Sequence, residues 1–135
     1  MPPKPLATKS KSASQPQLDA LRADVVRSLS ELEEAIVLTR TQLKVMETLM
    51  RRARKMMETG RGANDVARVA HAAQARANTS KIIRDVQAAR HRAQQAQFKM
   101  AAAEGATMAQ IARNWGVSRQ LVSRMVKEAT PRRRS

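Results

Sequence analysis

The sequence contains no cysteine and no tyrosine, and its aromatic residues are limited to one tryptophan and one phenylalanine. The absence of cysteine excludes disulfides and thiolate metal sites, which agrees with a reducing compartment such as the cytoplasm. The two histidines, His71 and His91, lie 20 residues apart with no acidic cluster beside either of them. We therefore expect no metal site, and we expect both histidines to be solvent-facing helix residues.

Signatures of catalysis and of membrane insertion are also missing. There is no glycine-rich phosphate loop and no serine nucleophile motif, so we expect no enzyme, no cofactor and no small-molecule substrate. No apolar run approaches the roughly 20 residues that span a bilayer, and the long amphipathic segments lack the Trp and Phe of interfacial helices. The first residues have no apolar core typical of a secretory signal. We expect a cytoplasmic protein that does not bind membranes.

Acidic residues are scarce. The sequence has 26 Lys and Arg but only 11 Asp and Glu, which gives a formal net charge of +15. A charge of this sign and size attracts polyanions, above all nucleic acid. The charge is unevenly distributed: residues 18–59 have 8 basic and 7 acidic side chains, residues 60–103 have 8 and 2, and residues 104–135 have 7 and 2. The first of these segments is thus predicted to serve assembly, and the other two to face the polyanion.

The two ends of the sequence are predicted to be basic tails. Residues 1–16 contain four of the five prolines, three lysines and no acid, and they cannot bury enough surface to offset the entropy of ordering. Residues 130–135 form the second tail, which follows the end of a helix at Pro131. With aromatic residues so rare, the chain between the tails is predicted to be all-α, with seams of Ala, Leu, Met, Val and Ile.

Residues 17–59 are predicted to form one long helix, since they contain strong helix formers and no glycine or proline. Apolar side chains recur at spacings of three and four, and neighbouring apolar residues make the face broader than a two-stranded coiled coil requires. This face is expected to meet more than one partner helix. The predicted oligomerisation residues are Leu29, Leu32, Ile36, Leu43, Met46 and Met50.

A break is predicted around Gly60 and Gly62, where Gly60 suits a left-handed residue after a helix and Asn64 or Asp65 suits the next N-cap. A second helix is expected over residues 65–103, with mostly small residues on its apolar face. Two helices of similar length joined by a short turn form an antiparallel hairpin. Residues 17–103 are therefore interpreted as a coiled-coil-like hairpin that acts as an oligomerisation arm.

Residues 104–128 contain a second pattern, which begins with the capping box Thr107–Gln110. Ile111 and Trp115 are four residues apart and are predicted to face inward, and Ala112 is small enough for a second helix to cross closely.

The pattern continues with Gly116, which can end the first helix in a left-handed conformation. Val117 is expected under the turn and Ser118 at the N-cap of the next helix, whose inward side chains are Val122 and Met125. The segment of residues 106–128 resembles the helix-turn-helix superfamily, which includes the DNA-binding modules of site-specific recombinases and of many bacterial and phage repressors. The end of the preceding helix, with Phe98, is expected to complete the core, so that the module covers residues 92–129.

The outward face of the second helix of this motif carries hydrogen-bonding and cationic side chains. Arg119 and Arg124 are predicted to offer forks to guanine, and Gln120 to pair with adenine. Ser118 and Ser123 are predicted to contact a base or a phosphate.

Other residues are expected to contact the DNA backbone. We expect the backbone amides of Thr107 and Gln110 to hold phosphate at the start of the supporting helix. Further attraction to phosphate is expected from Arg113, Lys127, Arg132, Arg133 and Arg134.

The sequence thus predicts a sequence-specific, nucleoid-associated protein that binds double-stranded DNA, a bacterial or phage transcriptional repressor acting as a homodimer or higher homo-oligomer. With two-fold symmetry, its target is an inverted repeat. One alternative is a plasmid or phage protein of the centromere-binding or nucleoid-organising kind. An alternative of another class is a coiled-coil adaptor that binds an acidic protein.

Overall fold

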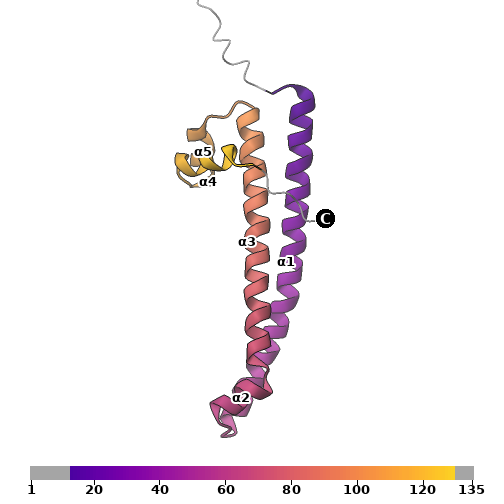
Figure 1. The fold of residues 1–135 in the computed structure, drawn as a ribbon, viewed down its shortest axis with the longest axis vertical. Helices are drawn as coiled ribbons and strands as arrows, with labels where there is room; N and C mark the ends of the chain where they lie inside the picture. Colours follow the sequence, from indigo (N-terminus) through magenta and orange to yellow (C-terminus); the bar gives the residue numbers. More distant parts are fainter. Residues whose placement is uncertain (1–12, 130–135) are drawn as a thin grey trace, which may run out of the picture. The chain divides into compact units, whose positions relative to one another are not determined.

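The computed structural model describes residues 13–129, and this range is all-α, as predicted, with five helices and no strand (Figure 1). Residues 1–12 and 130–135 lie outside the described residues, so the structure describes only the end of the first predicted tail and none of the second. None of the helices in the described range is both long enough and apolar enough to cross a membrane. The helices are α1 (Gln15–Glu58), α2 (Ala63–Val69), α3 (Ala72–Ala103), α4 (Met108–Trp115) and α5 (Arg119–Lys127).

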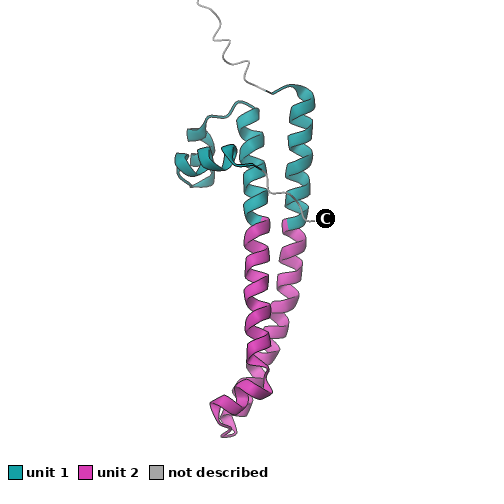
Figure 2. Ribbon diagram, viewed as in Figure 1, with its two compact units in different colours: residues 1–31, 90–135 teal, residues 32–89 magenta. Residues whose placement is uncertain are grey.

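The chain divides into two compact units (Figure 2). Unit 1 comprises residues 1–31 and 90–135, and unit 2 comprises residues 32–89. Both α1 and α3 contribute residues to each unit.

Helix α1 begins two residues earlier than predicted, so the proposed tail of residues 1–16 was too long. The backbone amide of Ser14 donates to Gln17 Oε1 at 2.9 Å, and the amide of Gln17 faces Ser14 Oγ at 3.4 Å. This arrangement is a capping box, which satisfies amides that the first turn leaves without partners. Pro16 fits because an amide hydrogen is not needed in the first turn of a helix.

Within unit 1, the first part of α1 lies antiparallel to the last part of α3. Arg22 pairs with Glu104 at 3.9 Å and Glu31 pairs with Arg92 at 3.7 Å, so residue numbers rise along one helix as they fall along the other. Several residues buried in these segments are small or unbranched, among them Ser28, Ala93, Ala96 and Met100.

Within unit 2, the rest of α1 lies antiparallel to the first part of α3, and Thr79 Oγ1 lies 3.3 Å from the sulfur of Met46. The half-buried residues of both helices recur at alternating spacings of three and four, as in a coiled coil. The predicted antiparallel pairing of two long helices is thus present in each unit. On α1 the half-buried residues of this unit are Leu32, Ala35, Thr39, Gln42, Met46, Leu49, Ala53 and Met56.

The apolar stripe predicted on α1 divides into two rows. Leu32 and Met46 are half-buried, whereas Leu29, Ile36, Leu43 and Met50 are 41%, 47%, 55% and 59% exposed. The row that completes the helix contact contains Ser28, Ala35, Gln42, Leu49 and Met56. The first three residues of this row are small or polar, and α3 buries the alanines Ala89 and Ala93, whose small side chains allow two helices to approach closely.

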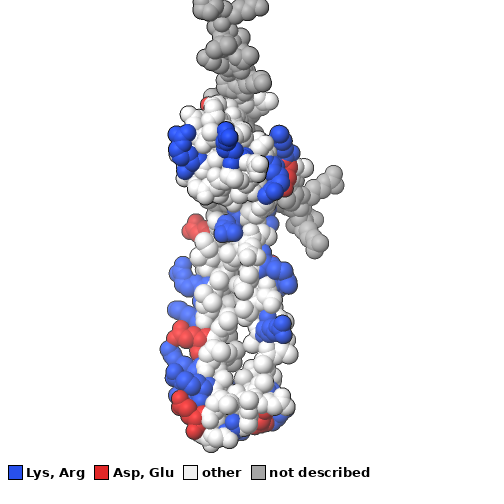
Figure 3. Space-filling model, turned by 90° about the vertical axis from the view of Figure 1, so that its left-hand side faces the viewer, with Lys and Arg blue, Asp and Glu red and all other residues white. Residues whose placement is uncertain are grey.

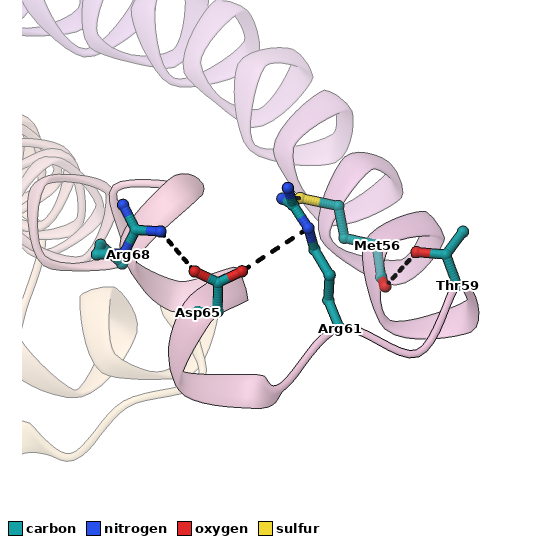
Figure 4. A network of polar contacts seen from close by, with 5 residues as sticks. All are labelled: Met56, Thr59, Arg61, Asp65 and Arg68. Atoms are coloured by element: carbon teal, nitrogen blue, oxygen red, sulfur yellow. Dashed lines mark hydrogen bonds and ion pairs between the residues drawn. The ribbon is translucent and has the colours of Figure 1, made fainter.

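The turn after α1 contains Gly60 at φ +91°, the left-handed residue that the sequence predicts. The next helix is capped by Gly62 rather than by Asn64 or Asp65, and no side chain bonds to this cap. Asp65 lies within the first turn of α2 instead, between Arg61 and Arg68, with N···O distances of 3.7 and 2.5 Å (Figure 4). The Asp65 carboxylate thus ties the loop to α2.

The prediction of one continuous helix over residues 65–103 is wrong near its start. His71 has φ +51°, and a residue in this region cannot continue a right-handed helix. The amide of His71 bonds to the carbonyl of Arg68 at 3.2 Å, which closes a tight turn after α2, and α3 begins at Ala72. Val66 is the buried residue of the short helix α2.

Candidate nucleic-acid interface

The capping box at the start of α4 is formed as the sequence predicts. The amide of Gln110 donates to Thr107 Oγ1 at 3.1 Å, and the amide of Thr107 donates to Gln110 Oε1 at 2.9 Å. Helix α4 ends at Gly116, which is left-handed with φ 66° and ψ 35°. An L-residue with a Cβ adopts this conformation only at a cost, so glycine is well suited to this position.

Helix α5 begins directly after this turn. Ser118 is its N-cap, and its Oγ accepts a hydrogen bond from the amide of Leu121 at 3.1 Å. Only residues 116–118 separate the two helices, so the orientation of α5 depends on few backbone angles.

A buried cluster joins α4 and α5 to the end of α3. Phe98 and Val122 are fully buried, and Met125 is 2% exposed. Ile111 and Ala112 of α4, at 3% and 5% exposure, complete the cluster. These side chains face inward as predicted, and α3 supplies the third helix of this core.

Trp115 is not the inward-facing residue that its spacing from Ile111 predicts, because it is 42% exposed. Phe98 occupies the interior, and the Trp115 ring meets it edge-on, with centroids 5.1 Å apart and an interplanar angle of 88°. The indole therefore covers the edge of the core, in a geometry favourable for aromatic pairs.

The C-terminal end of α5 is held by polar side chains of α3 that the sequence analysis did not identify. Gln95 is 2% exposed, and its Nε2 donates to the carbonyl of Met125 at 3.2 Å and to that of Glu128 at 3.3 Å. Lys99 Nζ donates to the Glu128 carbonyl at 2.6 Å. The last carbonyls of a helix lack intrahelical partners, so these bonds satisfy groups that α5 itself cannot.

One signal for Gln95 was present in the sequence: it lies three residues before Phe98, on the same face of α3. A polar residue on a buried face needs a hydrogen-bond partner. His91 is exposed on α3, as expected, and its Nε2 lies 3.5 Å from Glu128 Oε2. His71 is also exposed, but it lies in the turn between α2 and α3 and not in a helix as expected.

The polar residues of α5 lie together on the side of the helix away from the core. At about 100° per residue, Arg119, Gln120, Ser123, Arg124 and Lys127 fall within an arc of about 140°. All of them are exposed except Ser123, which is half-buried. We call this arc the polar face of α5.

Three residues expected to contact DNA are engaged in capping. Ser118 is exposed, but its Oγ already accepts the bond that caps α5. The backbone amides of Thr107 and Gln110 both donate within the capping box, so they are not available to a phosphate as expected. The amides of the next residues, Met108 and Ala109, are the ones that the first turn of a helix leaves without intrahelical partners.

Most charged side chains on the surface over α4 and α5 are basic (Figure 3). Figure 3 shows Lys and Arg side chains spread over this part of the molecule, with uncharged surface between them. Arg113 is exposed on α4 and adds to the cations of α5. The two acids nearby, Glu104 and Glu128, lie beside Arg22 and His91. Arg132, Arg133 and Arg134 lie outside the described residues.

Comparisons of the chain with protein-family models, with curated proteins and with solved structures found no match.

Proposed function

We propose that this protein binds double-stranded DNA in a sequence-directed manner, with the polar face of α5 in the major groove. The observation that carries the proposal is the position of this polar face, opposite a buried core that fixes α5 to α4 and α3. The major groove is about 12 Å wide and accepts an α-helix. In this proposal α4 and α5 are a helix-turn-helix, and α5 is its recognition helix.

The chemistry of the polar face suits the edges of base pairs. Arg119 and Arg124 can each donate two parallel hydrogen bonds to O6 and N7 of guanine. Gln120 can both donate and accept, as pairing with N7 and N6 of adenine requires. Ser123 is half-buried, so its reach is the shortest, and it contacts only a base edge or phosphate that comes close to the helix.

Contacts with phosphate would set the position of the helix in the groove. Arg113 lies on α4, Lys127 is the last residue of α5, and both carry exposed charges. The first free amides of α4, on Met108 and Ala109, add donors to which an anion binds readily. These groups give affinity for DNA of any sequence, whereas the side chains that contact bases, Arg119, Gln120 and Arg124, give selectivity.

Selectivity also requires that α5 keeps a fixed orientation relative to the buried cluster beneath it. Ser118 holds the first turn of α5, and Gln95 and Lys99 hold the carbonyls at its other end. Because both ends are bonded, the side chains of the polar face start from a nearly fixed backbone. Less conformational entropy is then lost on binding DNA.

Transcriptional repression in a bacterial or phage setting, with nucleoid association, is the use we propose for this activity. The test is selection of bound duplexes from a random pool by the full-length protein. Enrichment of one short motif is the expected result, with an affinity that falls steeply as salt rises. If no duplex binds even at low ionic strength, the proposal is wrong, and an adaptor for an acidic protein becomes the better account of the net charge.

A second candidate is a plasmid or phage protein that coats or bridges DNA, as centromere-binding and nucleoid-organising proteins do. It is favoured by the exposed basic residues of unit 2, which lie far along the chain from α5. Arg51, Arg52, Arg54 and Lys55 all belong to this set. A footprint that spreads over long DNA of any sequence would support this candidate, and a footprint confined to one short site would support repression.

A further inference from the structure

Helix α1 exposes a regular row of apolar side chains in unit 2. Ile36, Leu43, Met50 and Met57 follow one another at intervals of seven residues, and they are 47%, 55%, 59% and 47% exposed. We call these four residues the apolar row. A seven-residue interval keeps side chains in line along a helix that packs against another in a coiled coil. The row is therefore patterned for a helix that the single chain does not supply in this unit.

The apolar row lies on a definite side of the helix pair in unit 2. Leu38 and Asn78 help to line a groove between α1 and α3, and each immediately precedes a half-buried residue. Residues of the apolar row instead follow half-buried residues, as does Ile83 on α3, which is 52% exposed. In two antiparallel helices, residues that precede contact positions meet on one side and residues that follow them meet on the other. The apolar row and Ile83 thus share the side away from the groove.

A row of charges runs beside the apolar row on α1. Glu33, Arg40, Glu47 and Arg54 also recur every seven residues, and their signs alternate. Each apolar residue has one of these charges three residues before it, on the next strip of the helix surface. Alternating signs do not complement themselves when two identical helices run parallel in register, because each charge then faces its own copy.

An antiparallel arrangement satisfies both rows at once. If two copies of α1 run in opposite directions and cross near Leu43, Ile36 of each copy comes opposite Met50 of the other. Glu33 then comes opposite Arg54, and Arg40 comes opposite Glu47. Like charges across such an interface are unfavourable and opposite charges favourable, so this charge order selects the orientation.

We propose that a second copy of this chain binds to the apolar row, with its own apolar row running in the opposite direction. The proposal goes beyond the DNA-binding function and does not depend on it. Two members of the charge row have partners within α1: Glu47 pairs with Arg51, and Arg54 lies 3.7 Å from Glu58. All four of these side chains are more than 60% exposed, and exposed pairs one turn apart contribute only about 0.3–0.5 kcal/mol each. They can be exchanged for pairs between copies at little cost.

The first experiment measures the mass of the full-length protein by sedimentation equilibrium without DNA. The native protein is expected to dimerise, and Leu43→Glu is expected to raise the dissociation constant at least about tenfold, because two carboxylates would meet at the centre of an apolar contact. Val45→Glu is the matched control, since Val45 is 49% exposed on the same helix and precedes a half-buried residue. Circular dichroism confirms that each variant stays helical.

The second experiment tests the orientation. In the antiparallel arrangement, Arg40→Glu and Glu47→Arg each weaken association, and the double variant restores it. In a parallel arrangement neither single change matters, because each site already faces a like charge.

The absence of native cysteine allows a third readout. A mixture of Ile36→Cys and Met50→Cys proteins is expected to form a mixed disulfide faster than either protein alone forms its own. A native protein that stays monomeric, equal dissociation by Leu43→Glu and Val45→Glu, or preferred linkage of Ile36→Cys to itself would each overturn the proposal. Because none of these measurements contains DNA, their failure leaves the proposed DNA binding untouched.

Discussion

The buried side-chain amide of Gln95 on α3 donates to the main-chain carbonyl of Met125 in the last turn of α5, across 3.2 Å. The same nitrogen also donates to the carbonyl of Glu128 at 3.3 Å. These two bonds connect the end of a long helix to the short helix that carries the polar face. The position of α5 therefore depends on side chains of α3 as well as on the turn that precedes α5.

Replacing Gln95 with leucine is expected to lower the free energy of unfolding by about 1–3 kcal/mol, since the carbonyls it serves would lose a donor where water reaches them poorly. Urea denaturation measures the change. Gln87→Leu, at an exposed position of the same helix, is the control and is expected to change stability by less than about 0.5 kcal/mol. A loss of similar size in both variants would show that the Gln95 bonds do not stabilise the fold.

Phe98→Ala is expected to cost about 3–5 kcal/mol of stability, because a fully buried aromatic ring leaves a cavity when it is removed. Trp115→Ala is the matched comparison, and it should cost clearly less because that ring is 42% exposed. Thermal or urea unfolding of both variants measures the difference. If the tryptophan variant is the less stable of the two, the core is centred on Trp115 and not on Phe98.

Gly116→Ala is expected to destabilise the protein by about 1–2 kcal/mol through backbone strain alone, because φ is +66° and no atom lies within 4 Å of the position an added Cβ would occupy. Gly62→Ala provides the contrast. Its site is equally open but has φ −67°, so alanine there has no such strain. Because Gly62 is the N-cap of α2, where glycine is preferred to alanine, the change in stability is expected to stay within about 0.5 kcal/mol of zero. A clearly larger loss for Gly116→Ala in denaturant titrations supports the observed backbone, and equal destabilisation contradicts it.

Arg124→Ala is expected to weaken binding to the selected duplex by about 1–3 kcal/mol and to relax the preference at one base pair. Arg113→Ala should weaken binding to all duplexes about equally. The slope of log affinity against log salt concentration should become less steep by about 0.9, the amount expected when one phosphate contact is lost. Fluorescence anisotropy with selected and scrambled duplexes measures both. Equal loss on the two duplexes for Arg124→Ala would assign that side chain to phosphate.

Local sequence signals predicted the elements around the candidate interface well. Thr107 with Gln110, Gly116 and Ser118 each act within one turn of the helix, through their own side chain or backbone angle. Such effects depend on a few neighbouring residues, so a sequence displays them directly. The assignment of Val122 and Met125 to the core followed from helical periodicity in the same way.

Features that depend on distant residues were not predictable in this manner. The helix break at His71 lies in an alanine-rich stretch whose local sequence favours a helix. The break is therefore visible in the backbone of the folded chain and not in the local sequence. Whether Ser28 or Leu29 faces α3 depends on the distance between α1 and α3. That distance in turn depends on the small alanine side chains of α3. Trp115 is displaced from the interior by Phe98, a residue 17 positions earlier in the chain.

The central claim is that side chains of the polar face of α5 contact bases in the major groove. Methylation of guanine N7 in the selected duplex, followed by separation of bound and free DNA, tests it most directly, because N7 is exposed only in that groove and accepts from the arginine fork. The account predicts that methylation at specific guanines blocks binding of the native protein, and that Arg124→Ala loses this sensitivity at one of them. Binding that is indifferent to methylation at every guanine of the site would contradict it.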